Sequence, residues 1–155
     1  MTSLDETLAR VRAEGRAALV GYWPAGFPTK ERSIRAIETM IAAGADIIEV
    51  GLPYSDPVMD GGTIQAAAGQ ALAAGTRISD VFDVVEASVA AGAATVVMTY
   101  WNPVERYGVD RFASDLAKAG GAGLITPDMI PDEAEEWTSA SETHDLNRIY
   151  LVAPS

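Results

Sequence analysis

The sequence contains no cysteine and only one histidine, His144, among its 155 residues. Without cysteine, a disulfide framework and thiol chemistry are excluded. Positive charge is also scarce, with 11 lysines and arginines against 22 acidic residues and a formal net charge of -11. Nucleic acids are bound through clusters of basic residues, so a nucleic-acid partner is not expected.

Long apolar runs are missing as well. The longest uncharged stretch, 87–104, is interrupted by Gly92, Asn102 and Pro103 and is too polar to span a bilayer. The first sixteen residues are rich in charge and have no apolar signal core. We therefore expect a cytoplasmic protein without a membrane partner. The 48% hydrophobic and 21% charged residues are ordinary for a globular protein, and the length predicts a single domain over 1–155.

Short apolar runs alternate along the chain with segments of helical periodicity. We predict strands at 17–22, 46–51, 95–100, 123–126 and 148–153, and helices at 3–14, 30–43, 63–74, 79–91, 110–119 and 131–139. Uninterrupted apolar strands that alternate with helices are typical of a parallel sheet covered by helices. The sequence therefore predicts an α/β fold.

Two α/β architectures fit this alternation, an open doubly wound sheet and a closed (β/α)8 barrel. The first loop, 23–28, lacks the glycine-rich phosphate turn of a dinucleotide-binding sheet. Polar residues instead gather just after the predicted strands, where barrel enzymes build their active sites; they are Asp56, Asp60, Asn102, Asp128 and Ser155. This pattern favours the barrel.

The segment 45–61 carries two carboxyl groups of chemical interest. Strand alternation places Ile48 and Val50 on one face, and Glu49 with Ile47 and Gly51 on the other. Burial among apolar neighbours would raise the pKa of Glu49, which suits a group that transfers protons near neutral pH. Asp60 follows in the loop. On pattern alone, a single glutamate in a strand usually has a structural explanation, such as pairing with an arginine or reaching the rim, and Asp60-Gly61 would be a simple turn.

The loop GLPYSDPVMDG at 51–61, followed by Thr63-Ile64-Gln65, resembles the signature of the tryptophan synthase alpha subunit family. Similar motifs occur in the same order at Gly26 and Pro28, 98–103, 127–128 and 151–154. The resemblance implies a (β/α)8 barrel, of which this chain holds an N-terminal helix and about the first five β/α units. We therefore expect a C-terminally truncated chain. The turns that bind the substrate phosphate in the family follow later strands, so no residue here is assigned to phosphate.

The resemblance also implies an activity, the retro-aldol cleavage of indole-3-glycerol phosphate to indole and glyceraldehyde 3-phosphate. In the family, indole passes to a beta subunit that holds pyridoxal phosphate in an alpha2beta2 complex, and the alpha subunit needs no cofactor or metal. The residues that match the family's functional positions are Glu49 and Asp60 for catalysis, Tyr22, Met98, Tyr100 and Ile125 around the indole ring, and Asp56 and Asn102 where the beta subunit docks.

The chemistry of the two carboxyl groups agrees with this assignment. Cleavage needs a proton at C3 of indole, a role for Glu49, and a carboxylate beside the indole N–H, a role for Asp60. Glu49 could also take the glycerol hydroxyl proton, and the sequence does not separate the two transfers. A partner that docks without catalysis needs neither carboxylate, and a Schiff-base barrel needs a lysine at a strand end, whereas Lys30 and Lys118 fall on predicted helices. We expect the isolated chain to show no lyase turnover.

Overall fold

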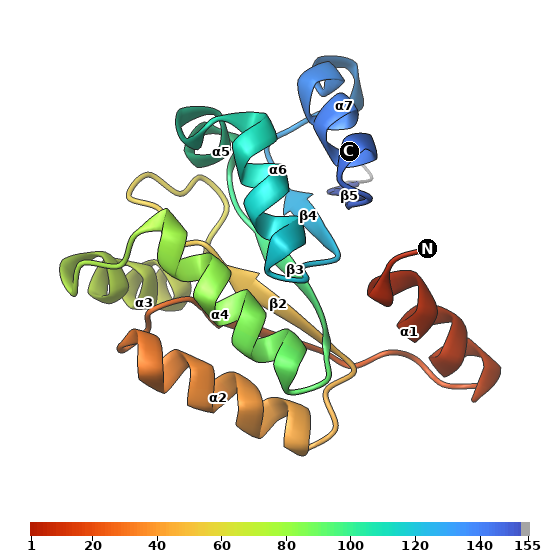
Figure 1. Ribbon diagram of the computed structural model, residues 1–155. Helices are drawn as coiled ribbons and strands as arrows, with labels where there is room; N and C mark the ends of the chain where they lie inside the picture. The colour runs from red at the N-terminus through yellow and green to blue at the C-terminus, as the bar shows by residue number, and fades with distance from the viewer. Residues whose placement is uncertain (153–155) are drawn as a thin grey trace.

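The computed structural model describes residues 1–152, in which five parallel strands form one sheet in the order β1-β2-β3-β4-β5 (Figure 1). The strands are β1 (Val20–Pro24), β2 (Ile47–Gly51), β3 (Ala94–Met98), β4 (Gly123–Thr126) and β5 (Asn147–Tyr150). In the register of the sheet, Glu49 on β2 lies between Tyr22 on β1 and Val96 on β3. The predicted α/β fold with a parallel sheet is confirmed.

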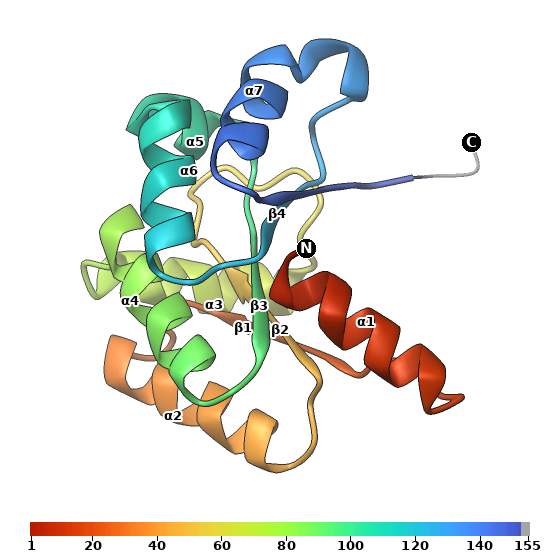
Figure 2. The same cartoon turned by 45° about the vertical axis from the view of Figure 1, so that its right-hand side comes forward.

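Helices cover one face of this sheet. This outer layer contains α2 (Lys30–Ala42), α4 (Ile78–Ala90), α6 (Val109–Lys118) and α7 (Glu135–Thr143). Figure 2 shows these four helices on one side of the strands and α1 (Ser3–Ala13) on the other. The helix α3 (Gly62–Ala73) follows the loop after β2 and contacts β1. One face of the sheet is thus closed by a layer of helices, and the other is covered by α1 at one end.

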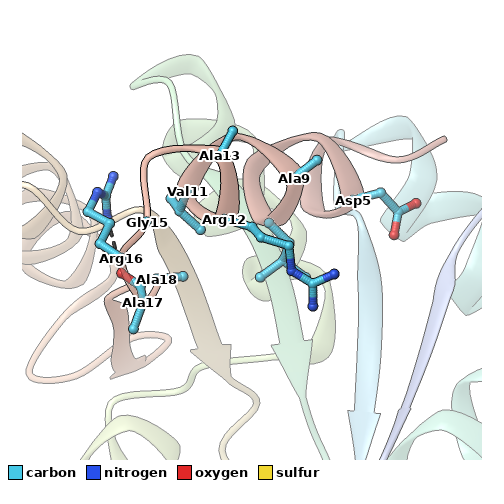
Figure 3. Close-up of a pocket in the computed structure, with 10 residues that line it drawn as sticks. Asp5, Ala9, Val11, Arg12, Ala13, Gly15, Arg16, Ala17 and Ala18 are labelled. Atoms are coloured by element: carbon cyan, nitrogen blue, oxygen red, sulfur yellow. Dashed lines mark hydrogen bonds between the residues drawn. The ribbon is translucent and has the colours of Figure 1, made fainter.

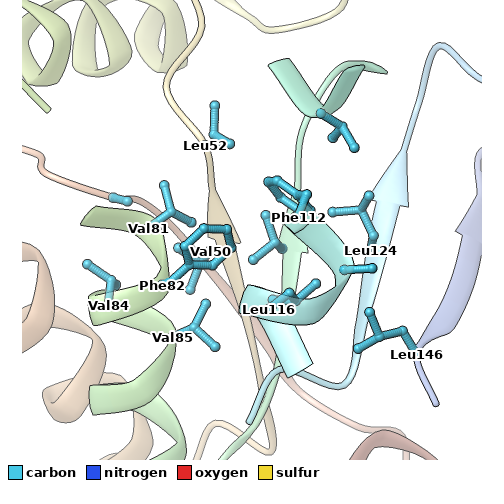
Figure 4. Packing of buried hydrophobic residues seen from close by; sticks show 14 of the residues in the cluster. Val50, Leu52, Val81, Phe82, Val84, Val85, Phe112, Leu116, Leu124 and Leu146 are labelled. Carbon is cyan, nitrogen blue, oxygen red and sulfur yellow. The ribbon is translucent and has the colours of Figure 1, made fainter. Parts of the chain in front are cut away.

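The main core lies between the sheet and the outer helices, where side chains of β2, α4 and α6 meet (Figure 4). Ile48, Val50 and Phe112 of α6 are fully buried there. The ring of Phe112 meets that of Phe82 on α4 edge to face, with the two ring centroids 5.2 Å apart. Ile47 instead joins a second cluster on the inner face, with Leu4, Ala94, Val96 and Ala122. The predicted alternation of β2 is therefore confirmed for its apolar residues.

The helix α1 packs across the N-terminal ends of the strands. A capping box between Thr2 and Asp5 starts this helix, and its buried residues include Leu4. The connection from α1 to β1 is held by Asp46, whose carboxylate accepts two bonds from Arg16 at 2.7 and 2.8 Å and one from the Leu19 N–H at 2.9 Å. These partners hold the pKa of Asp46 well below its usual range.

Several predicted boundaries are wrong. The first strand begins at Val20 and not at 17, because 17–19 form the connection that Asp46 holds. The fifth strand spans Asn147–Tyr150 instead of 148–153; position 153 and Ser155 lie outside the described residues. The predicted helix at 131–139 is a 3-10 turn (Pro131–Glu133) followed by α7.

The helix α5 (Trp101–Tyr107) was not predicted, because Asn102-Pro103 was interpreted as a break after a strand at 95–100. The third strand ends at Met98, and Pro103 stands in the first turn of α5. The first N–H groups of a helix have no partner within the helix, so proline costs little there. Across residues 1–152, the structure contains no helix long and apolar enough to cross a membrane.

Candidate active site

Glu49 is the third residue of β2 and is half-buried. Burial raises the pKa of its carboxyl group, in the direction expected from the sequence. No hydrogen bond or ion pair involves the Glu49 side chain within residues 1–152. The alternative in which this carboxyl group simply neutralises an arginine therefore has no support in the structure.

Tyr22 stands beside Glu49 on the neighbouring strand. Its pKa is raised well above the usual range, first by burial and then by the negative charges of Asp60 and Glu49. Tyr22 and Glu49 are paired in the register of β1 and β2, and the loop that carries Asp60 leaves the C-terminal end of β2. The end of β2 therefore connects the strand position of Glu49 to Asp60.

Asp60 lies near the end of the loop between β2 and α3, and its neighbours fix it from two sides. The hydroxyl of Tyr100 donates a hydrogen bond of 3.0 Å to Oδ1 of Asp60, and the Met59 N–H donates one of 3.0 Å to the same hydroxyl. On the other side, Nε2 of Gln65 donates to the Asp60 carbonyl oxygen at 2.8 Å. The loop that carries Asp60 is thus tied to both α3 and the segment after β3.

The residues expected to contact indole include two strand residues and one at the start of a helix. Met98 and Ile125 are paired in the register of β3 and β4, and Ile125 packs against the inner-face cluster. Tyr100 was expected to end the strand predicted at 95–100, but it follows β3 and stands at the N-cap of α5. It is buried, and its ring centroid lies 5.5 Å from that of Tyr54. The hydrogen bond from Tyr100 to Asp60 was not predicted.

The residues expected at a docking surface are exposed. Asp56 accepts a hydrogen bond of 2.5 Å from the Ser55 hydroxyl, and Asn102 accepts one of 3.4 Å from the Tyr54 hydroxyl. Asp128, a further polar residue after a strand, has a structural role: both carboxylate oxygens accept from the Trp101 N–H at 3.0 Å, which caps α5.

Other chemistries find little support among the described residues. Lys30 on α2 pairs with Asp80 and Asp83, and Lys118 on α6 pairs with Asp115, so neither lysine stands at a strand end. His144 stands at the C-cap of α7, where its Nε2 lies 3.1 Å from Oδ1 of Asp110. Residues 1–152 form no group of three or more acidic or histidine side chains that could hold a metal ion.

Two cavities lie at opposite ends of the sheet. One, of 670 Å³, is next to the candidate site and is lined by residues of β1, the following loop and α3, among them Tyr22, Trp23, Phe27 and Ile64. The other, of 880 Å³, lies beneath α1, and Figure 3 shows the strands running away from it. The first cavity shares Tyr22 with the candidate site, whereas the lining of the second contains no residue of that site.

Comparison with known proteins gives a consistent result. The family model described as tryptophan synthase alpha chain matches residues 8–155. The tryptophan synthase alpha chain of Thermobifida fusca is 63% identical over 155 residues, covering 100% of this chain and 57% of the relative. The tryptophan synthase alpha chain of Nocardia farcinica is 64% identical over 152 residues, which cover 98% of this chain and 57% of the relative.

Solved structures agree. Tryptophan synthase from M. tuberculosis, in an open form with BRD0059 bound, has a chain with a TM-score of 0.97 and 57% identity, covering 99% of this chain and 62% of that one. The alpha subunit of tryptophan synthase from Legionella pneumophila str. Paris has a TM-score of 0.95 and 34% identity, and the match covers 100% of this chain and 60% of that one. These likenesses confirm the expected fold class, the first units of a (β/α)8 barrel. The chain spans less than two thirds of each of these proteins.

Proposed function

The chain belongs to the tryptophan synthase alpha chain family, and from that premise we propose that it supplies the two catalytic carboxylates of an indole-3-glycerol-phosphate lyase. The observation that carries the proposal is the half-buried carboxyl group of Glu49, which has no hydrogen-bond or ion-pair partner within residues 1–152 and lies on the strand that leads into the Asp60 loop. Because the chain spans 57% of its relative from Thermobifida fusca, the activity is proposed for the complete barrel.

Glu49 is proposed as the proton-transfer group. Cleavage of the carbon–carbon bond requires a proton on C3 of the indole ring, which turns the ring into a leaving group. A half-buried carboxyl group with a raised pKa keeps its proton closer to neutral pH than an ordinary glutamic acid does. The glycerol hydroxyl must lose a proton as the bond breaks, and the conjugate carboxylate of Glu49 is the base proposed for that step.

Asp60 is proposed to stabilise the charge that develops at the indole nitrogen. Protonation at C3 leaves the ring positive, and a carboxylate that accepts a hydrogen bond from the ring N–H stabilises this state more than the neutral substrate. The hydrogen bonds from Tyr100 and Gln65 hold Asp60 before the reaction begins. A held carboxylate needs little reorganisation when the charge forms.

Four side chains are proposed to surround the indole ring, namely Tyr22, Met98, Tyr100 and Ile125. Tyr22, Met98 and Ile125 are half-buried, and Tyr100 is buried. Apolar and aromatic walls suit a flat heteroaromatic ring because they bury its faces while leaving polar contacts to the carboxylates.

The complete protein is proposed to act in tryptophan biosynthesis in the cytoplasm, as the alpha chain of an alpha2beta2 complex. Asp56 and Asn102 are exposed beside the candidate site and are the proposed contacts to the beta subunit. The cleavage consists of proton transfers and the breaking of one carbon–carbon bond, which the carboxyl groups can mediate. We therefore assign no cofactor to the alpha chain and place pyridoxal phosphate in the beta subunit.

The test uses a completed barrel, defined as residues 1–155 followed by the part of the Thermobifida fusca relative that this chain does not cover. Indole release from indole-3-glycerol phosphate is measured for the parent, Glu49→Gln and Asp60→Asn. We expect turnover by the parent and a loss of at least roughly a hundredfold in both variants. The matched control is Glu86→Gln on the exposed face of α4. Turnover of Glu49→Gln equal to this control would contradict the proposal.

A further inference from the structure

The hydroxyl of Tyr100 contacts two consecutive residues of the loop after β2. It accepts a hydrogen bond of 3.0 Å from the Met59 N–H and donates one of 3.0 Å to Oδ1 of Asp60. An apolar wall for a substrate ring needs neither bond, since phenylalanine would present the same ring. The hydroxyl therefore has a task that wall formation does not explain.

The protons of this arrangement can be assigned without ambiguity. A backbone N–H can only donate, so the bond from Met59 uses the acceptor side of the Tyr100 hydroxyl. The single proton of the hydroxyl then points to Oδ1 of Asp60, which must accept it.

The hydroxyl is also held in place by its own surroundings. Tyr100 is 3% exposed, and its ring packs against Tyr54. It stands at the N-cap of α5, where Asp128 accepts from the next N–H along the chain, that of Trp101. Because the backbone of Tyr100 joins β3 to α5, its hydroxyl offers a point outside the loop against which Asp60 is oriented.

We propose that Tyr100 is a positioning residue that orients Asp60, engaging Oδ1 and leaving Oδ2 as the oxygen that meets the indole N–H. This inference rests on the proposed function. Within residues 1–152, Oδ2 of Asp60 makes no hydrogen bond, which agrees with an oxygen reserved for a ligand. Tyr100 acts through Asp60 and contacts no reacting atom by its hydroxyl.

The test compares Tyr100→Phe with Tyr107→Phe in the completed barrel. Tyr107 offers matched chemistry away from the site, because its hydroxyl donates to Oδ2 of Asp115 at 2.8 Å between α5 and α6. For Tyr100→Phe we expect kcat to fall roughly 10- to 100-fold, the effect of losing one hydrogen bond to a charged group. KM should change less than about threefold. Tyr107→Phe should keep the kcat and the KM of the parent.

A second readout does not depend on turnover. Removing the Tyr100 hydroxyl leaves the Met59 N–H without its acceptor, so amide hydrogen exchange at Met59 should accelerate in Tyr100→Phe and not in Tyr107→Phe. A kcat within about twofold of the parent, or unchanged exchange at Met59, would overturn the inference. A parent that releases no indole would instead refute the proposed function. Amide exchange at Met59 would still test whether the Tyr100 hydroxyl holds this loop.

Discussion

The hydroxyl of Tyr22 lies so close to the backbone of Gly51 that a Cβ atom at position 51 would come within 2.2 Å of it. The ring carbons of Tyr22 would also be met, at 2.7 and 2.9 Å. Position 51 therefore requires glycine for space. Gly51, the last residue of β2, leaves room for the ring of Tyr22 on β1, and Tyr22 is the strand neighbour of Glu49.

Gly51→Ala is expected to destabilise the completed barrel by about 1–3 kcal/mol, because the added methyl group forces the Tyr22 ring out of place. The free energy of unfolding in urea measures this. In a Tyr22→Ala background the same substitution should cost almost nothing. Gly69→Ala within α3, where a Cβ atom meets nothing within 4 Å, serves as the control and should be neutral or stabilising. Equal costs in both Tyr22 backgrounds would show that the contact is unimportant.

Glu49→Gln is expected to stabilise the fold in a pH-dependent way. Burial raises the pKa of Glu49, so the folded state disfavours its charged form. The contribution of the glutamic acid is most favourable below the pKa of the unfolded chain and is lost as pH rises through the higher folded value. The variant should therefore exceed the parent in Tm at pH 8, and the difference should disappear at pH 4. A difference in Tm that does not vary with pH, or a pH dependence equal to that of Glu86→Gln, would contradict this explanation.

Asp46→Asn is expected to lower Tm at pH 7 and to have little effect in strong acid. The bonds from Arg16 and Leu19 hold the pKa of Asp46 well below its usual range. A depressed pKa gives stability that is present above the unfolded value and is lost as pH falls through the folded value. The measurement is thermal unfolding between pH 7 and pH 2. Asp132→Asn, at an exposed position, is the control, and an identical response of both variants would refute the role of these bonds.

The isolated chain is expected to release no indole and to self-associate. Within the described residues, β1 pairs only with β2, and Val20 of β1 is 47% exposed beside Leu19 at 59%. An unpaired, apolar sheet edge pairs readily with other chains. Val20→Lys should reduce the weight-average mass measured by sedimentation. Ala90→Lys, which adds the same charge at an exposed position of α4, should not. A monomeric parent would remove the basis of this expectation.

The sequence alone predicted the parts of the fold that depend on neighbouring residues. The alternation of Ile48, Glu49 and Val50 follows from the period of a strand, and the structure retains it. The parallel sheet and most of the helices likewise follow from short apolar runs and from helical periodicity within single segments. The direction of the pKa shift of Glu49 also follows, because an acid within an apolar strand loses water wherever that strand is buried.

The features that were missed depend on contacts between distant parts of the chain. The bond from Tyr100 to Asp60 joins residues 40 positions apart, and it forms only because the strand ends at Met98 and α5 begins at Trp101. The sequence motif around Pro103 suggested an end of structure, while the proline in fact stands inside the first helical turn. The assignment of Glu49 and Asp60 to catalysis came from the family motif, and it stays a prediction until turnover is measured.

The strand order β1-β2-β3-β4-β5 means that each strand pairs with the one synthesised just before it. A chain emerging from the ribosome can therefore build the sheet vectorially, adding one unit to a finished edge, without waiting for distant segments. Glu49, Asp60 and Tyr100 all precede the first helix after β3. Docking of β3 on β2 thus brings the segments that carry these three side chains next to one another before β4 and β5 are made.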